Sequence, residues 1–178
     1  MESLIDKLKY LGCFKEGDFV LKSDKLSNYY LDLRNLISYP TIMKELCNVL
    51  YKNIVTDIDS NTIICGLPYA GIPYATTLSV LYSIPMILLR KEKKTYGTSK
   101  LIEGVWNETD EIIIIDDILT TGESIIESLP HFNKFKIKKI IVIVDRKEGG
   151  SNKLRNMGYN VESLYTIDDF FIKDESTP

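Results

Sequence analysis

The segment from Ile112 to Ser124 constrains this chain more than any other. It begins with four consecutive isoleucines, and such β-branched runs are typical of strands buried on both faces of a parallel sheet. Asp116 and Asp117 follow where we expect the strand to end, and a Thr-Thr-Gly-Glu-Ser turn then leads into a predicted helix. Ligands bind beyond the carboxyl ends of strands in open α/β sheets, and small turns at helix starts offer N–H groups to phosphate. The segment therefore predicts two acids and an anion cradle at one edge of a sheet.

The rest of the chain alternates between strand and helix patterns, which predicts an α/β fold with a central, mainly parallel sheet flanked by helices. The predicted helices cover 3–11, 40–54, 72–82, 125–129, 152–157 and 167–172, and the predicted sheet strands cover 62–66, 85–90, 112–115, 139–145 and 160–165. Residues 14–34 predict a hairpin outside the main sheet, and 91–105 a loop without periodicity. We expect a single domain over 1–178, in which about 1–38 form an N-terminal helix and hairpin region and 173–178 a frayed tail.

Bulk composition narrows the class of protein. With 44% hydrophobic and 26% charged residues the chain has ordinary globular usage, and its net charge of −3 argues against a nucleic-acid partner held by bulk electrostatics. The longest apolar runs are far short of a membrane span, and the acidic N-terminus lacks the apolar core of a signal peptide. Cys13, Cys47 and Cys65 show no paired or metal-ligand spacing, as expected of reduced thiols. We therefore expect a cytoplasmic protein that binds neither membrane nor nucleic acid.

Asp116 and Asp117 alone fit two interpretations about equally well. Adjacent acids after a strand can simply cap the following helix and favour its dipole. The turn at 120–124 favours a binding role, because carboxylates suit sugar hydroxyls, with or without a divalent cation, while backbone amides and hydroxyls suit a phosphate. Together they predict a sugar phosphate as ligand.

This order of strand, Asp-Asp, two residues and Thr-Thr-Gly-x-Ser resembles the phosphoribosyl-pyrophosphate (PRPP) motif of type I phosphoribosyltransferases. The resemblance implies the type I phosphoribosyltransferase fold, with the acids on the ribose hydroxyls and the turn on the 5-phosphate. Over the whole chain, the PRPP-binding residues that it implies are Tyr69, Ala70, Arg90, Lys91, Lys94, Tyr96, Asp116, Asp117, Ile118, Leu119, Thr120, Thr121, Gly122, Glu123 and Ser124.

A basic block at 90–98 is the second motif. A solvated charged loop is the default interpretation, but three lysines and an arginine within five residues suit a pyrophosphate leaving group, on which negative charge builds. The block, with Leu-Ile-Glu-Gly at 101–104, resembles the catalytic loop of orotate phosphoribosyltransferases. Lys94 stands at the family's catalytic lysine. Tyr96 stands where many members have histidine, a form similar to that of the UMP synthases. We expect His131, the one histidine, on a helix surface elsewhere.

The hairpin carries the third motif. A surface hairpin is the simpler interpretation, but Lys-Ser followed by an aromatic residue eight positions after the lysine resembles the orotate-side hood of the same family. The resemblance implies orotate contacts from Lys22, Tyr30 and Leu31, and an aromatic lid can stack on a flat base. The family usually has glycine where Asp24 stands and often proline where Asn28 stands.

Two turns complete the resemblance. Gly66-Leu67-Pro68-Tyr69-Ala70-Gly71 matches a pyrophosphate-contacting turn, although many bacterial members have lysine where this chain has Ala70. The turn after the strand ending at Asp145 carries Arg146, which by itself fits a surface ion pair. By resemblance Arg146 grips the orotate carboxylate, a role that suits the bidentate guanidinium, and Thr120 also contacts orotate.

Five matches in order imply a magnesium-dependent orotate phosphoribosyltransferase of pyrimidine (UMP) biosynthesis, closest in its loops to the UMP synthase type. It converts orotate and PRPP to orotidine 5′-monophosphate and pyrophosphate, with Lys94, Asp116 and Asp117 as catalytic residues. Mg²⁺ is expected on PRPP, near the acid pair, without direct protein ligands. Family members are homodimers, so we expect Lys94, Arg90 and Tyr96 to act in the neighbouring site and Lys91 in its own. A separate or fused orotidine monophosphate decarboxylase is a further candidate partner.

Two alternatives stay open from the sequence. One is a phosphoribosyltransferase for another base, such as a purine, which the Arg146 turn and the Lys22 hairpin disfavour. The other is a non-catalytic protein that senses PRPP with the same fold, which the lysine-rich loop and the acid pair disfavour.

Overall fold

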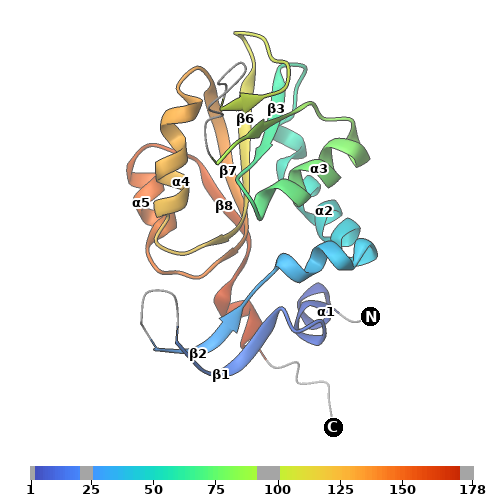
Figure 1. Cartoon of the computed structure of the whole chain (residues 1–178), viewed down its shortest axis with the longest axis vertical. Helices are drawn as coiled ribbons and strands as arrows, with labels where there is room; N and C mark the ends of the chain where they lie inside the picture. The colour runs from blue at the N-terminus through green and yellow to red at the C-terminus, as the bar shows by residue number, and fades with distance from the viewer. Residues whose placement is uncertain (1–2, 21–25, 92–100, 173–178) are drawn as a thin grey trace.

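The chain folds around one central sheet, with a small hairpin sheet at one end (Figure 1). The computed structural model describes residues 3–20, 26–91 and 101–172. The helices are α1 (Leu4–Tyr10), α2 (Pro40–Ile54), α3 (Gly71–Tyr82), α4 (Glu123–Ser128) and α5 (Gly150–Asn156), with 3₁₀ helices η1 (Arg34–Ser38), η2 (Val55–Asp57), η3 (Leu129–Phe132) and η4 (Ile167–Phe170). The strands are β1 (Phe14–Val20), β2 (Leu26–Leu31), β3 (Thr62–Gly66), β4 (Met86–Leu89), β5 (Ile102–Glu103), β6 (Glu111–Leu119), β7 (Lys136–Asp145) and β8 (Val161–Thr166).

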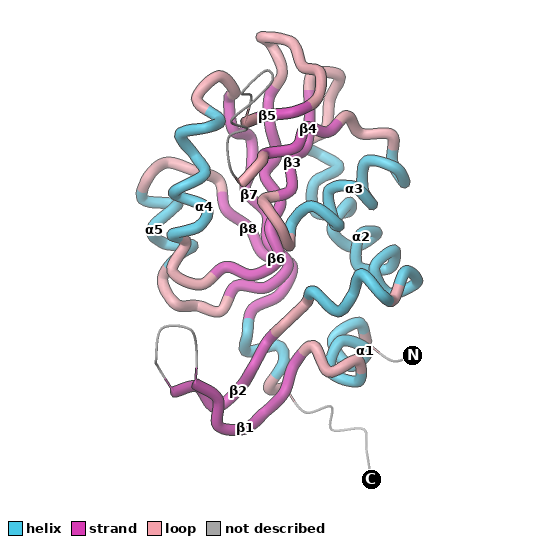
Figure 2. The backbone as a smooth tube through the Cα atoms, in the orientation of Figure 1, coloured by secondary structure: helices cyan, strands magenta, loops and turns pink. Residues whose placement is uncertain are grey.

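The main sheet has the expected mixed, mainly parallel character. Its described strands run in the order β5-β4-β3-β6-β7-β8, and every neighbouring pair is parallel except β4 and β5. Helices α2 and α3 cover one face, and α4 and α5 cover the other (Figures 1 and 2). The predicted α/β fold class is thereby confirmed.

The isoleucine run of β6 is buried on both faces, as its composition predicted. Ile113 and Ile115 pack into the core under α2 and α3, whereas Ile112 and Ile114 pack into the core under α4 and α5. All four are 0% exposed. Alternate side chains of a strand point to opposite faces, so one apolar run fills two cores and fixes β6 at the centre of the sheet.

Local signals placed the early helices correctly. Ser3 caps α1 in a reciprocal capping box with Asp6, and Pro40 opens α2, where its missing N–H costs no hydrogen bond. The predicted buried stripe of α2 was only partly right. Leu46 and Leu50 are buried, but Ile42 and Val49 are half-buried; the other fully buried positions of α2 are Met43, Cys47 and Ile54. The described residues include no helix long and apolar enough to cross a membrane.

The hairpin β1–β2 lies outside the main sheet, as predicted, and packs on the C-terminal segment. The ring of Phe14 lies 5.3 Å from that of Phe170 and 5.2 Å from that of Phe171. The segment 167–172 was predicted as a helix, but only the short 3₁₀ helix η4 forms there. Thr166 caps η4, and the buried Phe170 anchors it after β8. The expected tail, 173–178, lies outside the described residues.

Two further boundaries differ from the sequence prediction. The strand β6 continues through both acids to Leu119 because it pairs with β7 along its length, up to Leu119 opposite Asp145. The segment 91–105, predicted as a loop throughout, contains β5, which pairs antiparallel with the end of β4. A two-residue strand is too short to produce a period in the sequence.

Candidate active site

The two acids lie inside the last part of β6, not beyond it. Asp116 is 8% exposed and Asp117 is half-buried. The Asp117 backbone N–H donates to Asp116 Oδ1 at 3.0 Å, and the Ile118 N–H donates to Asp117 Oδ1 at 2.7 Å. Both acids line a cavity of about 470 Å³ with residues from the turns after β3 and β4. The carboxyl ends of β3, β4 and β6 therefore meet at one cavity, as expected of neighbouring parallel strands.

The electrostatics of this pair are unfavourable in the absence of a ligand. Burial raises the pKa of Asp116 to about 8, and the neighbouring Asp117 carboxylate adds to the rise. Burial also raises the pKa of Asp117, with backbone N–H groups and Arg34 acting against it. Within the described part of the chain, no Lys, Arg or His nitrogen lies within 4.0 Å of either carboxylate. Buried acids without a nearby cation mark a place where a cation or polar ligand group gains binding energy.

The turn after β6 is held by a glycine contact. Gly122 has φ +79, and α4 starts at the next residue without a side-chain cap. The Gly150 N–H donates to the Thr120 carbonyl at 3.0 Å, and a Cβ at Gly150 would lie 2.4 Å from that same oxygen. Only glycine fits there, so the turn of residues 120–122 packs directly on the turn that carries Arg146.

The turn between β3 and α3 is packed just as tightly on β6. The Leu67 N–H donates to the Ile115 carbonyl at 2.9 Å, and a Cβ at Gly71 would lie 2.3 Å from the same oxygen. The peptide bond between Pro68 and Tyr69 is cis. Tyr69 is 71% exposed, with its ring 5.4 Å from Lys91 Nζ, and both Tyr69 and Ala70 line the cavity of the acids.

Arg90 and Lys91 follow β4 and line the same cavity in their own chain. The Arg90 N–H donates to the Leu101 carbonyl at 2.8 Å, and its Nη1 lies 3.4 Å from Glu103 of β5. Arg90 Nε is buried and has no hydrogen-bond partner among the described residues. Lys94 and Tyr96 lie outside the described residues, so the structure does not place them.

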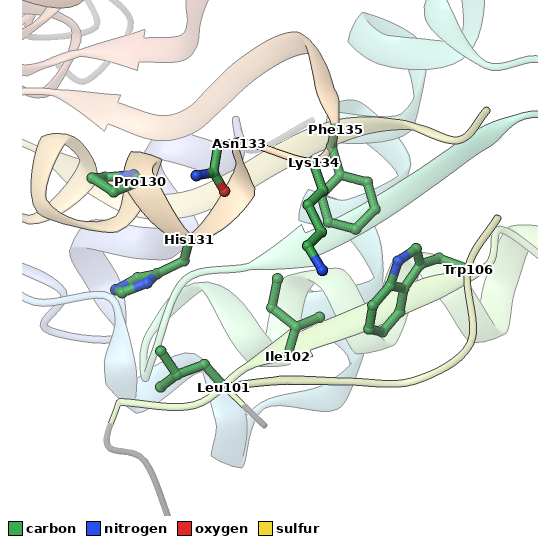
Figure 3. Close-up of a pocket in the computed structure, with 8 residues that line it drawn as sticks. All are labelled: Leu101, Ile102, Trp106, Pro130, His131, Asn133, Lys134 and Phe135. Atoms are coloured by element: carbon green, nitrogen blue, oxygen red, sulfur yellow. The ribbon is translucent and has the colours of Figure 1, made fainter. Parts of the chain in front are cut away.

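The cavity also has a wall that the sequence did not predict. Beyond the predicted Ser124, the residues Glu127, Ser128 and His131 line it from α4 and η3, at helical spacing. His131 is exposed on η3, as expected of a helix-surface residue, yet it borders the acid cavity as well. A second cavity of about 540 Å³ shares His131 with it. Figure 3 shows side chains that line this second cavity, among them His131, Leu101, Trp106 and Phe135. Among the described residues no acid lines that second cavity, so the acid cavity is the better candidate.

The base-side residues divide between two faces of β2. Tyr30 is 37% exposed, packs 5.5 Å from Phe19 and bonds Asp32 through its hydroxyl, while Leu31 is buried. Tyr29, which the sequence analysis did not single out, turns the other way and accepts a 3.0 Å hydrogen bond from Arg146 Nε. The alternation of side chains along β2 is the signal that would have identified it. Lys22 lies outside the described residues.

Comparison with known proteins gives this arrangement a family. The phosphoribosyl transferase domain family matches residues 39–174. The orotate phosphoribosyltransferase of Methanocaldococcus jannaschii is 33% identical over 166 residues, which cover 92% of this chain and 93% of that protein. The solved orotate phosphoribosyltransferase of Aeropyrum pernix superposes with a TM-score of 0.83 at 30% identity, covering 95% of this chain and 96% of that one.

A longer relative matches in part. The uridine 5′-monophosphate synthase of Bos taurus is 39% identical over 168 residues, 93% of this chain but 35% of that protein. This chain therefore spans about one third of that relative, and nearly the full length of the monofunctional ones. The chain belongs to the phosphoribosyltransferase family and, within it, to the orotate phosphoribosyltransferases.

Proposed function

We propose that this site transfers the 5-phosphoribosyl group of PRPP to orotate. A ring nitrogen of orotate loses its proton and bonds to the ribose anomeric carbon, while the bond from that carbon to pyrophosphate breaks. The observation that carries the proposal is the acid pair, which has no cation within 4.0 Å among the described residues and precedes a turn that packs on the turn carrying Arg146. Such a reaction needs mainly positioning and charge stabilisation from the protein.

The proposed PRPP contacts follow the walls of the acid cavity. Asp116 and Asp117 accept hydrogen bonds from the ribose hydroxyls, and Ile118–Ser124 surround the 5-phosphate. Tyr69, Ala70, Arg90 and Lys91 face the pyrophosphate, and the unpartnered Arg90 Nε fits a developing anion. Lys94 is proposed as the main cation on the leaving group, with Tyr96 beside it.

Magnesium fits this site as a companion of PRPP. The carboxylates of Asp116 and Asp117 are hard oxygen donors with raised pKa values and no ion pair in the described residues. The ion, when bound, neutralises phosphate charge. The protein's own part is to orient the ribose and to exclude water.

On the base side, Arg146 is the proposed carboxylate partner. Its side chain is 12% exposed, so its charge is poorly solvated and gains from a ligand anion. Lys22, Tyr30, Leu31 and Thr120 complete the proposed orotate contacts.

The proposal also covers the oligomeric state and the cellular compartment of the protein. We propose one phosphoribosyltransferase domain over 1–178 and a homodimer, in which Lys94 and Tyr96 reach the neighbouring site. Arg90 was expected to act there as well, but it lines the cavity of its own chain, so we propose that Arg90 and Lys91 both serve their own site. The three cysteines are buried and unpaired, which supports a reducing compartment such as the cytoplasm. A separate or fused decarboxylase would consume the product.

The direct test is to follow the loss of orotate absorbance with the purified chain, PRPP and Mg²⁺, and then to omit each component in turn. Loss of orotate with release of pyrophosphate, dependent on both PRPP and Mg²⁺, is the expected result. A panel of purine bases under the same conditions tests the alternative acceptor. Turnover of a purine instead of orotate, or PRPP binding without turnover of any base, would refute the proposal.

A further inference from the structure

Arg146 is held on two sides by other side chains. Its Nε donates to the hydroxyl of Tyr29 at 3.0 Å, and its Nη2 lies 3.1 Å from a carboxylate oxygen of Glu148. The guanidinium carbon lies 4.9 Å from the centre of the Tyr29 ring. Among the described residues, Nη1 has no hydrogen-bond partner. A flexible arginine in this state has already lost most of its rotational freedom.

The backbone beneath Arg146 is also fixed. The Arg146 N–H donates to the Leu119 carbonyl at 2.9 Å, next to the phosphate turn. Lys147 has φ 58, an uncommon value for a residue with a side chain, and its N–H bonds Asp145 Oδ1 at 2.7 Å. The main chain therefore fixes the position of the Arg146 backbone, and the contacts with Tyr29 and Glu148 fix the orientation of its guanidinium.

Tyr29 is itself firmly placed, by a different part of the chain. Its ring lies 5.9 Å from that of Phe14 on β1 and 5.6 Å from that of Phe171, which follows η4. Edge-to-face and offset aromatic pairs of this kind restrict ring orientation. Tyr29 thus connects the hairpin and the C-terminal segment to the turn after β7.

We propose that Tyr29 is a positioning residue for the acceptor base, resting on the proposed function. Its hydroxyl and ring orient the Arg146 guanidinium so that the remaining N–H groups meet a planar carboxylate on the ligand. Because Tyr29 belongs to β2, the hairpin takes part in carboxylate recognition through this contact, in addition to the proposed contacts of Tyr30 and Leu31. Preorganising a charged donor lowers the entropy that the ligand must otherwise pay for on binding.

The test is Tyr29→Phe, which keeps the aromatic packing and removes only the hydroxyl. We expect the KM for orotate to rise about 3- to 10-fold, with kcat and the KM for PRPP close to wild type, because a hydrogen bond to a charged group is lost. Tyr82→Phe is the matched control. Its hydroxyl donates to Asn48 at 2.7 Å between α2 and α3, so it costs a similar bond without touching Arg146.

A double-mutant cycle separates positioning from general damage. In an Arg146→Ala background, Tyr29→Phe should leave the KM for orotate unchanged, because the residue acts only through Arg146. Full additivity of the two changes, or an equal rise in both KM values for Tyr29→Phe, would overturn the inference. If the wild-type chain does not consume orotate with PRPP, the proposed function itself fails. If the wild type is active and Tyr29→Phe has a normal KM for orotate, only this inference fails.

Discussion

The two ends of the same parallel sheet treat buried charge in opposite ways. At the carboxyl ends of the strands, Asp116 and Asp117 lie side by side without an ion-pair partner in the described chain. At the amino ends, Lys139 is 4% exposed and lies 2.6 Å from Asp57 and 2.9 Å from Glu162. Burial lowers the pKa of Lys139, but the two nearby carboxylates outweigh this and raise the pKa overall.

The difference shows which end is built for stability and which for binding. Lys138, a half-buried lysine of the same end, also has two acids near it, with Asp59 at 2.5 Å and Glu111 at 3.2 Å. A lysine that already lies between two acids has little charge left to offer a ligand. The acid pair keeps its unfavourable energy until a ligand relieves it, which is typical of binding sites.

The largest expected effect is on catalysis by Asp116→Asn. We expect kcat/KM to fall about 100- to 1,000-fold, because a preorganised polar contact to the reacting sugar is removed. The melting temperature should stay equal or rise, since the amide relieves the repulsion between the acids. Steady-state kinetics and a thermal melt measure both quantities. Asp57→Asn is the matched control, which we expect to lower stability and leave activity intact. If Asp116→Asn and Asp57→Asn changed activity and melting temperature in the same way, the proposed difference between the two ends of the sheet would be wrong.

Arg146→Ala should have the next largest effect, confined to one substrate. Truncating a poorly solvated charge that binds a ligand carboxylate typically costs 2 kcal/mol or more, so we expect the KM for orotate to rise about 30- to 100-fold. The KM for PRPP should change much less. Initial rates with each substrate varied in turn provide the measurement, and an equal loss for both substrates would contradict the assigned role.

Lys139→Met should destabilise the amino end without affecting the site. Removing one partner leaves Asp57 and Glu162 near apolar surface, and we expect about 2–3 kcal/mol lower free energy of unfolding. Urea titration measures the loss, and KM values should match wild type. Lys136→Ala is the control on the same strand. The Lys136 side chain, which pairs with Glu111, is 75% exposed, so the melting temperature of the variant should not differ measurably from that of wild type.

The smallest expected effect is a pH dependence of stability that belongs to Asp116. Because its pKa is raised in the folded state, its contribution to stability is full below the unfolded pKa and is lost as pH rises toward 8. Asp116→Asn lacks this loss. The variant should therefore gain on wild type by on the order of 1–2 kcal/mol between about pH 5 and about pH 8.5 in urea titrations. A constant difference across that range would show that the acid is not buried as described.

Much of the site was predictable because its motifs are local. The strand, acids and turn at 112–124 are contiguous, and their order alone predicted a ribose-phosphate site. The Thr120–Gly122 turn needs Gly150 as its neighbour, however, and nothing in the local sequence of either turn reveals a 2.4 Å approach. Tyr29 was overlooked for a similar reason, because which of two adjacent tyrosines faces Arg146 depends on the register of β1 with β2.

The sequence by itself determined the fold class, the central strand and the chemical types at the site, because these follow from periodicity and from short motifs. Only the tertiary structure decided that the acids lie inside β6, that His131 borders their cavity and that Lys138 and Lys139 at the amino ends of the strands are each paired with acids. The physical reason is that burial and charge pairing depend on neighbours far apart in the chain. The segment 112–124 determines which chemical groups are present at the site. The packing of β3, β4 and β7 around it determines how far those groups are exposed to water and how close cations lie to them.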